Sequence, residues 1–147
     1  MRLNFDCVRD IMLWVEDITT PTRSAMYIDT DSANRTAKAL GYTDSQEPST
    51  EQQNLLSKYS NATLVYHINY CIEAGLLKKD FQLGPEIIFI SDLTPQGHEF
   101  LGNIRNPSNY DQIKNLALQS GIETLTAFIT IAGTVTGNII SKIITNQ

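Results

Sequence analysis

The polar face of one short segment carries side chains suited to reading nucleic acid. Apolar residues recur at helical spacing in residues 61–74, which predicts a helix with one buried stripe. The stripe consists of Leu64, Ile68, Cys71 and Ile72. With the stripe turned inward, the opposite face presents neutral hydrogen-bonding side chains, which can contact the edges of base pairs. They are Asn61, Thr63, Tyr66, His67, Asn69 and Tyr70.

Three lysines flank this face and could contact DNA phosphates. They are Lys58, Lys78 and Lys79. So few cations predict a modest phosphate footprint. Glu73 and Asp80 lie close in sequence and oppose it. The same face could instead contact a protein, and both interpretations stay open at this point.

Metal binding and catalysis have weaker support. His67 and Cys71 are four residues apart and could share a helix face, but one such pair does not make a metal site. The alternative for His67 is a partly buried ring that is hydrogen-bonded within the fold. The acids Asp6, Asp10 and Glu16 are expected on a solvated helix face, and no nucleophile, phosphate or dinucleotide motif occurs. We therefore expect a non-enzymatic protein without a metal or cofactor.

The overall charge argues against bulk electrostatic binding. The 147 residues include 11 Lys and Arg against 16 Asp and Glu, a net charge of −5. A protein coating nucleic acid or lying on a membrane surface would be basic. Cys7 and Cys71 are far apart and are expected to be reduced, buried thiols. The opening residues lack a signal-peptide pattern, so a cytoplasmic protein is expected.

The elements that would position the polar face are mostly helices. The pattern predicts one short strand, one β-hairpin and several helices. The strand covers 25–28, the hairpin 76–92, and the helices 3–17, 33–40, 50–59, 61–74, 110–119 and 122–146, with a further helix starting at Thr94-Pro95. Asp31 or Ser32 is expected to cap the second helix, and residues 42–50 are expected to form a polar loop. Residues 106–109 are expected to end the helix that begins at Thr94-Pro95. Whether 50–74 is one helix or two stays open.

Two helices followed by a hairpin predict a specific fold class. The layout is that of a winged helix-turn-helix, in which the helix before the hairpin reads DNA and the hairpin is the wing. We expect an α+β, mainly α fold: a winged helix-turn-helix core with an N-terminal amphipathic helix and a C-terminal helical extension. The expected division is a domain over 1–105 and an extension over 106–147.

Two motifs carry a resemblance to known proteins. The run from Val65 to Leu77, ending in Glu-Ala-Gly-Leu-Leu, resembles the helix–wing junction of bacterial winged-helix regulators. Residues 92–101, with Leu-Thr-Pro-Gln-Gly-His-Glu-Phe-Leu, resemble the start of their next helix. Together with the opening residues 2–11, the chain resembles a small family common in phages and prophages, known only as a domain of unknown function. The resemblance implies a phage context and transfers no activity.

The C-terminal segment predicts an interface between copies of the chain. Residues 124–141 carry no charge but include five threonines, which makes them too polar for a typical membrane span. An apolar stripe and a Gly-x-x-x-Gly pattern share this helix, so we expect it to form a homodimer. The expected contact residues are Leu125, Phe128, Ile129, Ala132, Gly133, Val135, Gly137 and Ile139.

These observations favour a small phage or prophage DNA-binding regulator. The alternative is a phage protein that binds and inhibits a host protein, such as a defence component or polymerase. Its acidic charge would favour a basic protein surface over DNA. A membrane-associated protein anchored by residues 122–146 is the weakest of the three interpretations.

Overall fold

A computed structural model describes residues 1–41, 47–81 and 84–146. Its elements are mainly helices, and in chain order they are α1 (Phe5–Ile18), β1 (Ala25–Ile28), α2 (Thr30–Leu40), α3 (Thr50–Leu56), α4 (Asn61–Glu73), β2 (Leu77–Lys79), β3 (Ile87–Leu93), α5 (Pro95–Ile104), α6 (Pro107–Gln119) and α7 (Leu125–Thr145). The expected α+β, mainly α class is confirmed. Part of the expected loop 42–50 lies outside the described residues.

The three strands form one antiparallel sheet in the order β1-β3-β2. The edge strand β1 pairs Ala25 with Ile90 and Ile28 with Ile87. Side chains alternate along β3, where Ile88 and Ile90 are buried and their neighbours are half-buried. The sheet therefore covers the core with one face only, as an antiparallel sheet commonly does.

Polar caps set the helix boundaries. Asn4, Ser60 and Thr94 each accept a hydrogen bond from a backbone N–H in the first turn of their helix. Ser60 begins a new helix after α3 has ended at Leu56, so residues 50–74 form two helices.

Two expected boundaries were wrong. Asp29, rather than Asp31 or Ser32, caps α2 through its carboxylate. The helix before Asn106 ends at Ile104, as expected, but Asn106 caps α6, which begins at Pro107 rather than at residue 110. Proline suits that position because its missing N–H would have no intrahelical partner there.

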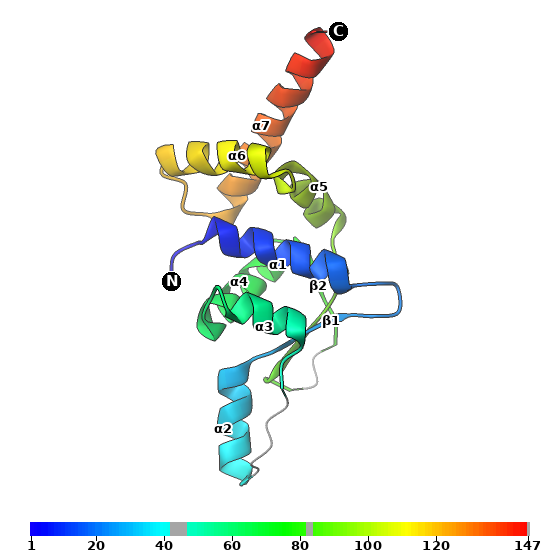
Figure 1. The fold of residues 1–147 in the computed structure, drawn as a ribbon, viewed down its shortest axis with the longest axis vertical. Helices are drawn as coiled ribbons and strands as arrows, with labels where there is room; N and C mark the ends of the chain where they lie inside the picture. Colours follow the sequence, from blue (N-terminus) through cyan, green and yellow to red (C-terminus); the bar gives the residue numbers. More distant parts are fainter. Residues whose placement is uncertain (42–46, 82–83, 147) are drawn as a thin grey trace.

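The core is built around α1. This helix packs against α3, α4, α5 and β3 and runs across the middle of the molecule in Figure 1. Phe5 stacks on Phe128 of α7 with ring centroids 4.2 Å apart, and Phe100 of α5 meets the same ring edge-on. Residues on both sides of position 105 therefore share one hydrophobic core.

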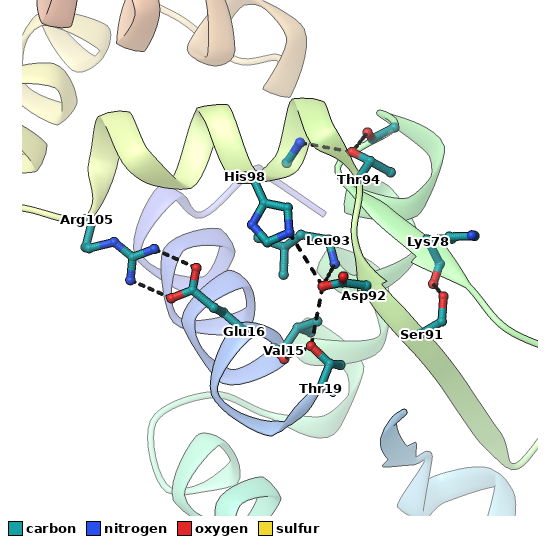
Figure 2. Close-up of polar contacts among 12 residues, drawn as sticks. Val15, Glu16, Thr19, Lys78, Ser91, Asp92, Leu93, Thr94, His98 and Arg105 are labelled. Atoms are coloured by element: carbon teal, nitrogen blue, oxygen red, sulfur yellow. Dashed lines mark hydrogen bonds and ion pairs between the residues drawn. The ribbon is translucent and has the colours of Figure 1, made fainter. Parts of the chain in front are cut away.

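The acids of α1 do not form the solvated face that was expected. Asp6 accepts hydrogen bonds from Lys114 and Tyr110 of α6, and Glu16 accepts two from Arg105, each 2.6 Å long (Figure 2). Hydrogen bonds from Arg105 lower the pKa of Glu16. Burial raises the pKa of Asp6, but the bonds from Lys114 and Tyr110 outweigh it and leave that pKa lowered. These carboxylates fix α1 to its neighbours.

Two helices extend from the core in opposite directions. In Figure 1, α2 points away at one end of the molecule and the far half of α7 at the other. No residue of α2 is buried, and the buried residues of α7 are Leu125, Phe128 and Ala132, all in its first half. By length and composition α7 could cross a membrane, although its first turns belong to the core.

Candidate nucleic-acid interface

The outward face of α4 is narrower than the sequence predicted. Leu64, His67, Ile68 and Cys71 are buried on the inner side. Ala62, Tyr66 and Glu73 are exposed, and Asn69 is half-buried. These four positions are three or four residues apart and therefore lie along one side of the helix.

His67 was expected on that face, and this is wrong. Its side chain is fully buried. Nε2 accepts a hydrogen bond from the backbone N–H of Asn4 at 2.9 Å, and Nδ1 donates to the carbonyl oxygen of Thr63 at 2.7 Å. Burial lowers the pKa of the ring, which favours this neutral form. Because both nitrogens are occupied, His67 contacts no base and cannot join Cys71 as a metal ligand.

Asn61 has a structural role at the start of α4. Its Oδ1 accepts from the hydroxyl of Tyr27 at 2.8 Å, and its Nδ2 donates to Asp29 at 2.9 Å and to Asp31 at 3.1 Å. The side chain thereby joins β1, α2 and α4. Two carboxylates beside this end of the helix also make it unfavourable for a phosphate.

Tyr70 and Thr63 are also engaged within the fold. The Tyr70 hydroxyl accepts from the backbone N–H of Leu125 at 3.3 Å, which links α4 to the start of α7. The Thr63 hydroxyl lies 2.8 Å from that of Ser60. Of the six expected reading residues, Tyr66 and Asn69 therefore keep an available polar group on the outward side.

Of the three expected phosphate-binding lysines, one is engaged within the fold and two are not. Lys58 pairs with Asp10 of α1 at 3.4 Å. Lys78 and Lys79 are exposed on β2, directly after α4, and none of the ion pairs found among the described residues includes them. Asp80 follows them and accepts a hydrogen bond from Ser24 at 2.9 Å. Lys78 and Lys79 are thus the two expected phosphate-binding lysines that remain available.

A close junction holds α4 and the hairpin in place. Gly75 has φ +77°. Its N–H donates to the carbonyl oxygen of Ile72, and the N–H of Leu76 donates to that of Cys71, so these bonds end the helix. The hydroxyl of Thr94 donates to the Gly75 carbonyl at 2.5 Å and accepts from the N–H of Gly97 at 2.9 Å, a pair of contacts seen beside Thr94 in Figure 2.

Gly97 brings the two sequence motifs into contact. A Cβ at this position would lie 2.0 Å from the carbonyl oxygen of Leu76, so only glycine lets α5 approach so closely. The sequence showed both motifs but gave no sign that they meet. Nearby, His98 of α5 approaches Asp92 of β3 at 3.6 Å (Figure 2).

The thiols have the environment of structural cysteines. Cys7 and Cys71 are free and buried, as expected. Burial raises the pKa of Cys7 to about 12 and also raises that of Cys71, so neither is a reactive thiolate. Across residues 1–41, 47–81 and 84–146, no group of three or more His, Cys, Asp or Glu side chains is placed to hold a metal ion.

Comparison with known proteins gives a family without an assigned activity. Residues 2–123 match the family described as "Hypothetical protein (DUF2513)". The match includes both motifs of the α4–hairpin junction and ends just before α7 begins. No curated protein and no solved structure matches the chain.

Proposed function

We propose that this chain, which belongs to the DUF2513 family of hypothetical proteins, is a non-enzymatic winged-helix protein that binds double-stranded DNA through α4 and β2. The winged-helix assignment is supported by the order α1, β1, α3, α4, β2, β3 and by the sheet order β1-β3-β2. In this assignment α4 is the reading helix, β2 and β3 form the wing, and α2 is an insertion before the helix-turn-helix.

The observation that carries the proposal is a set of available polar side chains on the reading helix and at the start of the wing. Tyr66 and Asn69 lie outward on α4, and Lys78 and Lys79 follow on β2. An asparagine amide can make paired hydrogen bonds to adenine, and exposed lysines bind phosphates. Two lysines per chain predict weak, salt-sensitive binding. We further propose a regulatory role in a phage or prophage, in line with the resemblance of the sequence.

Sequence selection tests the reading role of α4. Duplexes recovered from a random library by the wild-type protein should share a site, and the Asn69→Ala variant should recover a different or relaxed one. Glu51→Ala is the matched control, since it alters an exposed polar residue of α3, outside the proposed surface. The proposal fails if the wild-type protein enriches no site, or if Asn69→Ala enriches the same site with equal strength.

A second candidate function is binding to a basic surface of a host protein. Glu73 on the outward side of α4 and the carboxylates of Asp29 and Asp31 beside its first turn favour it. Tagged protein should then recover one stoichiometric partner from host lysate, equally with and without nuclease. Recovery of discrete DNA that nuclease removes would instead support the DNA proposal.

A further inference from the structure

The free end of α7 is an apolar surface that the rest of the described chain leaves uncovered. Ala132 is its last fully buried residue, and the helix then continues to Thr145 for about 13 residues, or about 20 Å, with Val135 on the opposite side still packed against the core. In Figure 1 this part runs out beyond α6. Ile140, Ile143 and Ile144 are 50%, 58% and 66% exposed. Isoleucines in successive turns of an exposed helix favour a binding surface.

The shape of this surface is self-complementary. Ile140 and Ile144 form a ridge at a spacing of four residues. Gly133 and Gly137 form a shallow groove at the same spacing, which Ser141 continues, and a Cβ at either glycine would meet nothing within 4 Å. Rows four residues apart on two helices pack ridge into groove. One α7 therefore carries both halves of such a contact.

The lack of charge on this surface is also compatible with binding a second copy. No charged residue occurs from Thr124 to Ser141, and Lys142 is the one charge that follows in the described helix. The hydroxyls of Thr130, Thr134 and Thr145 bond to backbone carbonyls four residues earlier in the same helix. Their donors are therefore satisfied before any partner arrives. A surface without charge offers no complementarity to a charged partner, but two identical uncharged surfaces can meet without repulsion.

A membrane span explains this helix less well. Crossing a bilayer takes about 30 Å of apolar helix, and the free part is about 20 Å long. The missing length would have to come from the turns that hold Phe128 against Phe5 and Phe100 in the core. One lysine and a net charge of −5 also provide little attraction to an anionic membrane surface.

We propose that the free end of α7 binds the same surface of a second copy of this chain. The ridge of Ile140 and Ile144 from one copy then lies in the Gly133–Gly137 groove of the other. Two helix segments of about 20 Å bury less than the roughly 1,200 Å² of a standard interface, so the dimer is weak and depends on concentration. The contact lies further along α7 than the sequence indicated, since Leu125, Phe128 and Ala132 belong to the chain's own core.

Sedimentation velocity of the purified chain, without DNA, tests this proposal. The mass should rise with concentration from 16.4 kDa toward twice that value. Ile140→Glu combined with Ile144→Glu should remain a monomer at every concentration. The matched control is Leu40→Glu with Leu118→Glu, which adds the same charges at side chains that are 66% and 59% exposed on α2 and α6. The control should associate like the wild type.

A substitution that fills the groove distinguishes a specific contact from non-specific hydrophobic association. Gly137→Leu favours helix formation, so it should not unfold α7, and it adds apolar surface. It should nevertheless weaken dimerisation at least tenfold, because leucine blocks the groove. The proposal is overturned if Gly137→Leu strengthens association or if the wild type remains monomeric. It is also overturned if the wild type is monomeric in solution but floats with phosphatidylcholine or phosphatidylglycerol vesicles. None of these outcomes bears on DNA binding.

Discussion

The helices α4 and α7 were both predicted to present a functional surface, and the fold treats them differently. Most polar side chains on α4 form bonds within the protein: His67 to Asn4, Asn61 to Tyr27, and Tyr70 to Leu125. In α7 the buried residues Leu125, Phe128 and Ala132 all lie in the first half, whereas Ile140, Ile143 and Ile144 near the end of the helix are exposed. Polar residues on a helix packed into the core, such as α4, thus mostly form hydrogen bonds within the protein. Surface that is available for a partner begins where a helix, such as α7, extends beyond the core.

The largest expected effect separates the two halves of α7. Phe128→Ala should lower the free energy of unfolding by about 3–5 kcal/mol, because the ring is fully buried between Phe5 and Phe100. Ile144→Ala should change it by less than about 0.5 kcal/mol in dilute protein, where the side chain faces water. Urea unfolding followed by circular dichroism measures both. Equal effects would mean that the far half of α7 is packed in solution.

A pair of glycine substitutions in α5 tests the junction that holds α4 against the hairpin. Gly97→Ala should destabilise the protein by about 1–3 kcal/mol, because the added methyl group meets the Leu76 carbonyl. Gly102→Ala has open space and should stabilise the same helix by about 0.5–1 kcal/mol. Thermal unfolding of both variants gives the comparison. A neutral Gly97→Ala would show that the close approach of α5 to Leu76 is not needed.

A smaller effect concerns the pH dependence that His67 confers. Its folded pKa is lowered, so the folded state binds fewer protons than the unfolded state, in which the pKa is about 6.5. Stability is therefore full above about pH 6.5 and falls as the pH drops toward the folded pKa. The same loss should be absent in His67→Gln.

This pH measurement is best made in a His98→Gln background, because His98 is the one other histidine of the chain. The pKa values of Asp6, Glu16 and Asp29 are also lowered, but these carboxyls protonate well below pH 6. The slope of stability between about pH 6.5 and 5 therefore reports on His67. An unchanged slope in His67→Gln would contradict the hydrogen-bonded, neutral ring.

The sequence pattern predicted the secondary-structure elements better than it predicted which side chains of each element face outward. Helical spacing placed α1, α4 and α7, and the turn residue Gly75 correctly ended α4. The face of His67 could not be predicted, because its inward position depends on the backbone N–H of Asn4, 63 residues away. The same holds for Asn61, whose partners lie in β1 and α2. Apolar periodicity is local, whereas the partner of a polar group is set by the tertiary fold.

The salt dependence of DNA binding tests the central proposal most directly. Two phosphate contacts per chain predict that log K falls with log salt concentration with a slope of about −1.8, and loss of both lysines should remove most of it. Fluorescence anisotropy with a random-sequence duplex compares the wild type with Lys78→Ala/Lys79→Ala, and Lys142→Ala on α7 serves as a cation control. Binding that weakens in the lysine pair but not in Lys142→Ala supports the α4–β2 surface. Absence of wild-type binding at low salt, or equal loss in Lys142→Ala, would contradict it.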